Sequence, residues 1–184
     1  SNTGTSNLWS ALIAGGQPAV KLGTSPAWLS LFQRFVATPD GTRVVYVADR
    51  DADEVFELYS VPTDNSGPAV KISAPLVTGG DVNNDLALTP DSRHAIYSAD
   101  ATVDGLVEIF NAPLDGTGPT VFLARTGTQG AHKTTDTHVI IHGAVLGPES
   151  ELTSVPIDGS LPPNRLHEPL SSGSSIGADF ELVP

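Results

Sequence analysis

The sequence contains no cysteine among its 184 residues. This absence excludes disulfide bonds, thiolate metal ligands and cysteine nucleophiles, and it leaves the redox compartment open because reducing and oxidising environments both tolerate such a chain. Basic residues are also scarce, since nine Lys and Arg stand against 21 Asp and Glu, for a formal net charge of −12. That excess repels phosphate backbones and anionic lipids, so we expect no nucleic acid and no acidic membrane surface as a partner.

Long apolar runs and targeting segments are absent as well. No apolar run approaches the roughly 18 residues of a membrane-spanning helix, so we predict no membrane insertion. The basic and apolar regions of a signal peptide are missing and the chain begins with Ser rather than Met, which leads us to expect that the natural N-terminus has been removed. Scarce Lys and abundant Asn, Thr, Ser, Gly and Pro favour a secreted or periplasmic β-protein.

The sequence does contain a repeat with a period of roughly 50 residues. A turn of the type Thr-Pro-Asp-Gly begins at Thr38, recurs at Thr89, and recurs in degenerate form at Thr134. Two further segments of the repeat, residues 58–62 and 68–72, have similar counterparts in the same order in the next unit. Self-similarity at this period is typical of propellers, solenoids and arrays.

Each unit contains four short strand-like runs, and no run shows the apolar spacing of a helix. The second run of each complete unit is apolar at successive positions, which is typical of a strand buried on both faces. Four antiparallel strands at this period predict a propeller blade, because a solenoid would have shorter coils and a sandwich would have no period. The runs are 35–38, 44–48, 55–59 and 69–72 in the first complete unit, and 86–89, 95–99, 106–110 and 120–123 in the second.

The sequence therefore predicts an all-β chain that forms an arc of a β-propeller, with three full four-stranded antiparallel blades and a partial blade at each end. Rings usually hold about four to eight blades, so such an arc needs completion. The expected units are the third and fourth strands of a partial blade in 1–30, blades in 31–76 and 77–125, a degenerate blade in 126–170, and the first strand of a further blade in 171–184.

The incomplete outer blades predict a protein partner. Either the rest of a longer chain supplies the missing strands, or copies of the chain share their incomplete blades and form a ring or a filament. The residues that we expect at such contacts are apolar positions of the terminal strands, namely Leu8, Trp9, Phe180 and Leu182.

The aligned repeats resemble the TolB-like (WD-type) β-propeller repeat family, found in bacterial envelope proteins and in the propellers that precede some serine peptidase domains. The residues that carry the resemblance are 38–41, 44–46, 48–49 and 57–62, with their counterparts in the second repeat. The resemblance covers nearly the whole chain and implies a ring of about six to eight blades that serves protein contact or substrate gating. It carries over no catalytic residue, and the sequence contains no Gly-x-Ser-x-Gly motif.

Acidic residues cluster between the second and third runs of the first complete unit. Asp49, Asp51 and Asp53 stand at alternate positions and could coordinate Ca²⁺, which takes about six to eight oxygen ligands. The alternative is a solvated hairpin loop, because the Gly and the distal Glu of an EF-type loop are not at the required spacing. Apart from this Ca²⁺ we expect no cofactor.

Three histidines offer a second metal hypothesis. His138 and His142 lie four residues apart on one predicted strand and face the same way, with His132 on the preceding strand. Three imidazoles could hold zinc. The alternative is a structural histidine, because His142 stands in the column that Tyr46 and Tyr97 occupy in the other units.

Two columns of acids recur in every complete unit: Glu57, Glu108 and Glu151, and Asp40, Asp91 and Asp136. Such recurrence predicts a structural role, because one active site needs its residues once. We expect the Asp side chains to accept hydrogen bonds from turn amides two residues on.

Four aromatic residues lie near the blade boundaries, namely Trp9, Trp28, Phe32 and Phe35. Packing between blades is favoured for them over an exposed recognition patch.

These observations favour a non-catalytic binding or structural module of a secreted or cell-envelope bacterial protein, completed by self-association or by the rest of a longer chain. The alternative is the propeller portion of a serine peptidase-like hydrolase, or of a lyase, whose catalytic residues lie outside this chain.

Overall fold

The computed structural model describes residues 7–11, 14, 16–22, 34–126, 132–171, 173–177 and 181. Within these residues all regular structure is β and no helix is present. The strands form three four-stranded antiparallel sheets and one two-stranded sheet. The all-β prediction and the repeated four-stranded units are therefore confirmed, and the arrangement is consistent with blade-like units.

The two-stranded sheet is formed by β1 (Trp9–Ser10) and β2 (Val20–Lys21). Three four-stranded sheets follow, named here the first, second and third sheets. The first sheet contains β3 (Arg34–Ala37), β4 (Arg43–Ala48), β5 (Glu57–Pro62) and β6 (Val70–Lys71). The second contains β7 (Val82–Leu88), β8 (His94–Ala99), β9 (Glu108–Pro113) and β10 (Val121–Arg125). The third contains β11 (His132–Thr134), β12 (His138–Gly143), β13 (Glu151–Pro156) and β14 (Asn164–Arg165).

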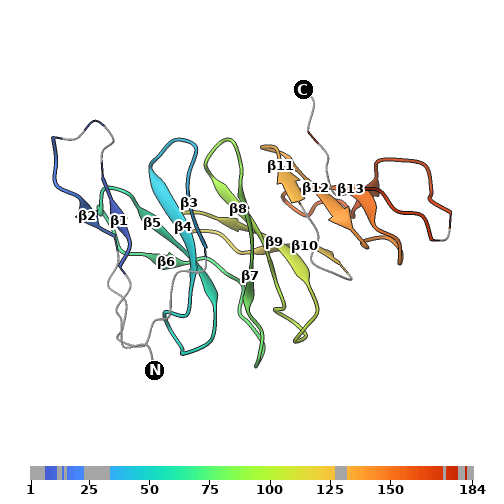
Figure 1. The fold of residues 1–184 in the computed structure, drawn as a ribbon, viewed down its shortest axis with the longest axis horizontal. Helices are drawn as coiled ribbons and strands as arrows, with labels where there is room; N and C mark the ends of the chain where they lie inside the picture. Colours follow the sequence, from blue (N-terminus) through green and yellow to red (C-terminus); the bar gives the residue numbers. More distant parts are fainter. Residues whose placement is uncertain are drawn as a thin grey trace.

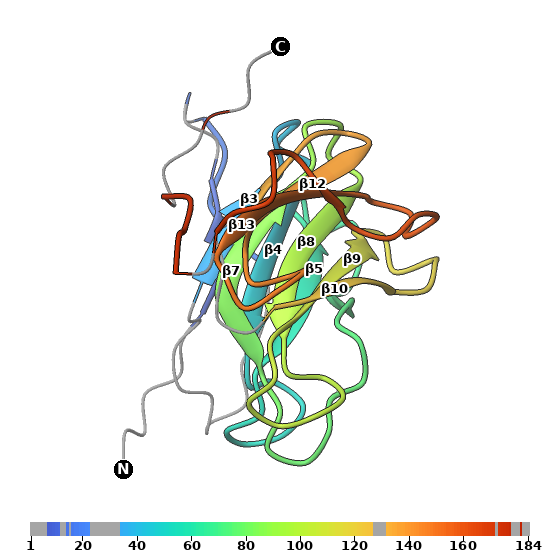
Figure 2. The ribbon, with the colours of Figure 1, turned by 90° about the vertical axis from the view of Figure 1, so that its right-hand side faces the viewer.

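Within each sheet the strands lie in the order in which they occur in the sequence. Figure 1 shows the sheets following one another along the long axis, from the two-stranded sheet at one end to the third sheet at the other. Figure 2, at a right angle to that view, shows the sheets stacked one behind the next. Each unit of the repeat therefore folds into its own sheet and packs on the sheet before it.

The second strand of each sheet is buried on both faces, as the continuous apolar runs predict. In β4, Val45 and Val47 pack into the core between the first and second sheets. Tyr46 of the same strand faces the opposite way, into the core that Leu8 and Leu22 of the two-stranded sheet complete. Alternate side chains of one strand thus join two neighbouring sheets, which explains why this run carries no polar alternation.

The third strands begin two residues later than predicted, at Glu57 and Glu108 rather than at 55 and 106. The backbone turns just before each strand: the Val55 amide donates to the Ala52 carbonyl at 3.3 Å, and Glu54 has φ 58°. The Val55 amide is thus used by the turn, and the Phe56 amide donates to the Asp81 carboxylate at 2.8 Å, so neither amide pairs with the neighbouring strand.

The link between the first and second sheets contains a glycine that no larger residue can replace without movement. A Cβ atom on Gly80 would lie far inside van der Waals contact with the Asp100 backbone carbonyl oxygen. We expect Gly80→Ala to lower the free energy of unfolding by about 2 kcal/mol, because overpacking forces the backbone apart. Urea denaturation measures this loss. Gly177→Ala is the control, since a Cβ there meets nothing within 4 Å, and an equal loss in both variants would contradict the prediction.

The described part of the chain contains no helix with the length and apolarity that crossing a membrane requires.

Candidate functional site

The recurring glutamates are buried at the start of the third strand of each sheet. Each carboxylate forms an ion pair with a basic side chain of the fourth strand: Glu57 with Lys71 at 2.8 Å, Glu108 with Arg125 at 2.8 Å, and Glu151 with Arg165 at 2.7 Å. The same pair in three sheets ties the outermost strand to its neighbour. The predicted structural role of this column is therefore confirmed.

The two-stranded sheet keeps the cation of this pair and lacks the acid. Alignment on Trp9 and Tyr59 places Asn7 in the position of Glu57, and Lys21 in the position of Lys71. In the register of this sheet Lys21 lies opposite Trp9. This edge of the molecule thus presents a lysine and a tryptophan side by side.

In the first two sheets the turn between the first and second strands is stabilised by its aspartate side chain. The Asp40 carboxylate accepts from the Thr42 amide at 3.0 Å, and the Asp91 carboxylate accepts from the Arg93 amide at 3.0 Å, as predicted. Hydrogen bonds from the Thr38 hydroxyl and the Thr42 amide lower the pKa of Asp40. The turns of neighbouring sheets are also joined, because the Asp40 amide donates to the Ser92 hydroxyl at 3.1 Å.

The third sheet departs from this pattern. There the amide two residues after Asp136, that of His138, donates to the Thr135 hydroxyl at 2.9 Å, so a threonine takes the place expected for Asp136. The Asp136 carboxylate accepts instead from the Asp91 amide of the second sheet at 2.8 Å. The prediction for Asp136 is wrong, because the degenerate turn frees this side chain to join two sheets.

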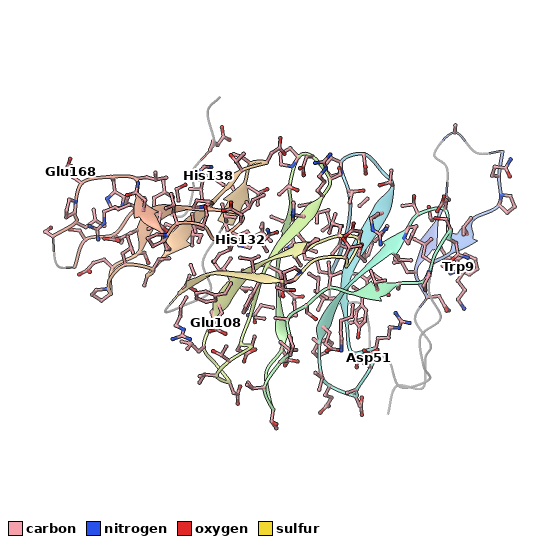
Figure 3. The ribbon with its side chains drawn as sticks, turned by 180° about the vertical axis from the view of Figure 1, so that it is seen from behind. Trp9, Asp51, Glu108, His132, His138 and Glu168 are labelled. Carbon is pink, nitrogen blue, oxygen red and sulfur yellow. The ribbon has the colours of Figure 1, made fainter. Side chains whose placement is uncertain are left out.

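The acidic loop does not gather its carboxylates at one point. Asp49 is buried, Asp53 is exposed, and the Asp51 carboxylate lies 3.2 Å from the Lys71 ammonium group. Figure 3 shows Asp51 near the end of the first sheet. Within the described residues no group of three or more His, Asp or Glu side chains lies in an arrangement that could hold a metal ion. Calcium binding by this loop stays a prediction, and the geometry gives it no support.

The three histidines of the zinc hypothesis have different partners. The His132 ring contacts the Ile96 carbonyl at 3.2 Å, the His138 ring contacts the Thr137 hydroxyl at 3.0 Å, and His142 Nε2 lies 2.6 Å from the Ile176 carbonyl. A shared metal would need the three rings to converge, and they do not. The structural alternative holds for His142, whose side chain is half-buried and hydrogen-bonded to backbone.

A polar cluster lies where the first strands of the three sheets approach one another, and it extends from the exposed Arg34 to the buried side chain of His132. We call it the inner cluster, and its members are Arg34 of β3, Asp85 of β7, Ser98 of β8 and His132 of β11. Two guanidinium nitrogens of Arg34 donate to the carbonyls on either side of Asp85, those of Asn84 at 2.7 Å and Leu86 at 3.2 Å. The cluster thus connects the first sheet to the second.

Asp85 and His132 extend the inner cluster into the third sheet. The Asp85 carboxylate accepts from the Ser98 hydroxyl through Oδ1, and its Oδ2 lies 3.6 Å from His132 Nδ1. The His132 side chain is only 2% exposed. Burial lowers the pKa of His132, and the Asp85 carboxylate only partly opposes this effect. Burial therefore disfavours the protonated ring, whereas the neighbouring carboxylate favours it.

The order of these groups differs from that of a serine hydrolase. In a catalytic triad the imidazole lies between the hydroxyl and the carboxylate, so that it can take the hydroxyl proton. Here the carboxylate of Asp85 lies between Ser98 and His132. Ser98 is also fully buried. The inner cluster can therefore order three sheets, but Ser98 is not positioned as a nucleophile by His132.

No protein-family model matches the sequence. A search of curated proteins gives no match either.

An open cleft of about 310 Å³ lies at the boundary of the first and second sheets, on the side of the first turns. Arg43, Arg93 and His94 line it, together with Asp115. The Asp115 carboxylate interacts electrostatically with Arg43 and partly neutralises its charge, and Arg43 also donates to the Ser60 hydroxyl at 2.7 Å. The cleft therefore lies at a contact between sheets, in which Asp115 is a counter-ion for Arg43.

The residues predicted for assembly have different surroundings. Leu8 is buried against the first sheet, so its side chain belongs to the core of the chain. Trp9 is 56% exposed and lies at one end of the molecule, opposite Glu168 at the other end (Figure 3). Phe180 and Leu182 lie outside the described residues. Of the two that the structure describes, Leu8 is buried and Trp9 has an exposed side chain.

The prediction of packing between blades is wrong for Trp9 and Phe35. Phe35 is 62% exposed. It pairs with Tyr46 across β3 and β4, so both side chains face the side on which the two-stranded sheet packs. The two-stranded sheet covers the side chain of Tyr46 and leaves that of Phe35 exposed to solvent. The other two residues, Trp28 and Phe32, lie outside the described residues.

The inner cluster was not found from the sequence, although a signal was present. Arg34 and Asp85 occupy the same position of successive repeats, and the strand register places His132 in the position of Phe35 and Leu86. Charged or polar residues on a strand that is otherwise apolar indicate a contact that is not hydrophobic. Pairing the members of the cluster required the lateral approach of the three first strands, which no local pattern encodes.

Proposed function

We propose that the chain is an arc of a β-propeller, related to the TolB-like repeats, that acts as a non-catalytic binding or structural module of a secreted or cell-envelope bacterial protein. The observation that carries this proposal is the lateral contact of the first strands. Arg34 of β3 bonds to β7, and the Thr134 hydroxyl of β11 donates to the Leu88 carbonyl of β7 at 3.0 Å. Strands that are first in each sheet and that lie side by side are typical of blades around a common axis.

The partner in this proposal is an extended protein segment that completes the two-stranded sheet. It comes from a second copy of the chain or from the rest of a longer parent chain. Three features of this end of the molecule support it: Trp9 is exposed, Phe35 is exposed on the face that the two-stranded sheet covers only in part, and Lys21 occupies a cation position whose acid is replaced by Asn7. A segment with apolar and acidic side chains fits such an edge.

The experiment that tests this proposal is the mass of the 184-residue chain in solution as a function of concentration, measured by sedimentation equilibrium. We expect reversible self-association, and we expect Trp9→Ser to weaken it by about tenfold or more, because an exposed tryptophan is a frequent centre of binding energy. Val103→Ser is the matched control, since Val103 is 54% exposed in a loop of the second sheet.

A chain that stays monomeric throughout the concentration range would show that copies of it do not complete the sheet. Equal weakening by Trp9→Ser and Val103→Ser would show that the contact does not use this edge. Either result removes the support that Trp9 gives to the proposal.

A further inference from the structure

The two-stranded sheet repeats the pairing of β5 and β6 residue for residue. The cross-strand pairs that correspond are Trp9–Lys21 with Tyr59–Lys71, and Ser10–Val20 with Ser60–Val70. In the first sheet β5 also pairs with β4 along its other edge, whereas β1 pairs only with β2 within the described residues. The place beside β1 thus corresponds to the place that β4 occupies in the first sheet.

The second strand presents an aromatic ring wherever the third strand has one at the position of Trp9. In the first sheet Tyr46 of β4 pairs with Tyr59 of β5, and the two rings stack with their centres 5.5 Å apart. In the second sheet Tyr97 of β8 pairs with Phe110 of β9, and these rings stack at 5.6 Å. Two sheets therefore have the same aromatic pair at the same place.

The third sheet shows that the two positions change together. Thr153 stands at the position of Tyr59 and Phe110, and its partner across β12 and β13 is the aliphatic Ile141. Aromatic pairs on neighbouring strands gain stability from the contact of the rings as well as from the area that they bury. Trp9 is aromatic, and its side chain is exposed although Tyr59 is buried at the same position. An aromatic residue opposite Trp9 is therefore what the place beside β1 fits.

Phe35 indicates which residues flank this aromatic one. In the second sheet Leu86 holds the position of Phe35, and it is buried in the core to which Val45 and Val47 of β4 contribute. These two valines lie on either side of Tyr46, and they face the second sheet. Phe35 is exposed where the place beside β1 stays empty within the described residues. Aliphatic residues on both sides of the aromatic one can cover Phe35 in the same way.

Lys21 indicates an acidic residue in the loop that follows. Its counterpart Lys71 lies 2.8 Å from the Glu57 carboxylate and 3.2 Å from the Asp51 carboxylate. Asp51 belongs to the loop after β4, and Asn7 stands in the position of Glu57. An acid in the loop after the incoming strand can therefore supply the counter-ion that Asn7 cannot.

We propose that the edge formed by Trp9, Phe35 and Lys21 binds one antiparallel β-strand of a partner polypeptide, with an aromatic residue opposite Trp9, an aliphatic residue on each side of it, and an acid in the next loop. The inference rests on the proposed function, because it names the segment that completes the two-stranded sheet. Main-chain hydrogen bonds to β1 supply affinity in such strand addition, and the side-chain contacts supply specificity.

A synthetic peptide of residues 43–53 is the probe, because it contains the β4 pattern and the acid of its loop. The anisotropy of the labelled peptide is measured during titration with the 184-residue chain, at dilutions at which the chain is monomeric. We expect saturable binding, which Trp9→Ser weakens by about tenfold or more. Tyr46→Ser in the peptide should weaken it equally, and both changes together little more than either alone. Val103→Ser in the chain is the control and should leave binding unchanged.

The contact of the acid with Lys21 is tested separately. Asp51→Asn in the peptide should weaken binding to the natural chain by about threefold, since an exposed ion pair contributes little. The same peptide should bind the Lys21→Gln chain as tightly as the unchanged peptide does, because the partner of the acid is gone. Equal weakening for both chains would overturn the pairing with Lys21.

Disulfide trapping tests the register. The chain has no cysteine, so Ser10→Cys supplies its single thiol. Ser60, the counterpart of Ser10, pairs with Val45 in the first sheet. A peptide with Val45→Cys should therefore form the disulfide at least about tenfold faster than one with Val47→Cys, because a disulfide needs Cα atoms about 4.4–6.8 Å apart.

A peptide that does not bind, that binds Trp9→Ser as tightly as the natural chain, or that forms disulfides equally fast from both positions would overturn the inference. These outcomes are distinct from failure of the proposed function. A chain that self-associates through Trp9 but rejects the peptide retains the proposed function and loses the inference. A chain that stays monomeric but binds the peptide in register retains the inference.

Discussion

Replacement of Tyr97 by alanine is expected to lower the free energy of unfolding by about 4 kcal/mol, since removing a buried aromatic ring leaves a cavity that the surrounding strands cannot fill. Tyr97 is fully buried in the core between the first and second sheets. Its ring stacks on Phe110 with the ring centres 5.6 Å apart. Urea or thermal denaturation of the variant measures the loss.

The hydroxyl of the same residue contributes separately. Tyr97 accepts a hydrogen bond from the Ala74 amide at 2.8 Å, so it also fixes the link between β6 and β7. We expect Tyr97→Phe to cost about 1 kcal/mol, because the ring stays and one hydrogen bond is lost. Leu161→Ala is the control, since Leu161 is 64% exposed. If Tyr97→Ala cost no more than Leu161→Ala, the core between the first two sheets would not be packed as described.

Replacement of Glu108 by alanine is expected to cost about 3 kcal/mol, because hydrogen bonds to a buried charged group are among the stronger ones in proteins. Its carboxylate accepts from the Thr102 amide at 2.9 Å, from the Thr102 hydroxyl at 2.6 Å and from Arg125 at 2.8 Å. The Arg125 side chain is 53% exposed and can turn to water once its partner is gone. The loss therefore comes mainly from the loop around Thr102, which is left without its acceptor.

The pH dependence of this effect has a definite sign. Burial raises the pKa of Glu108, but the bonds from Thr102 and Arg125 outweigh burial and lower it below the ordinary 4.5. A lowered carboxyl pKa stabilises the fold above the ordinary value, and this stability is lost as the pH falls through the folded pKa. The difference in stability between the natural chain and Glu108→Ala should thus shrink in acid. The exposed Glu168→Gln serves as control, and a difference that stays constant with pH would contradict the ionised pair.

The strand order of the three sheets could be predicted from the sequence because the information is repeated. The runs 44–48 and 95–99 are apolar at nearly every position, with Ser98 as the exception, and that pattern suffices to place a strand between two neighbouring sheets. The same comparison identified the glutamate column as structural. In these cases the same local pattern occurs in several repeats, and it predicts both the burial of a residue and the strands beside it.

Features that depend on what lies beside a sheet could not be predicted in this way. Trp9 and Phe35 are large aromatic residues of the kind that usually lies in a core. Their exposure depends on how far the two-stranded sheet extends over β3 and β4. The inner cluster likewise depends on the lateral distance between β3, β7 and β11. Alternation of residue types along a strand shows on which face of the sheet a side chain lies. It does not show which part of the molecule covers that face.

In the backbone pairing of the described sheets, every strand pairs only with strands adjacent to it in the chain. Contacts of this kind close small loops, and their entropy cost is low compared with that of pairing distant segments. Each sheet can therefore assemble during synthesis as soon as its own four strands have left the ribosome, and it can serve as the template on which the next one condenses.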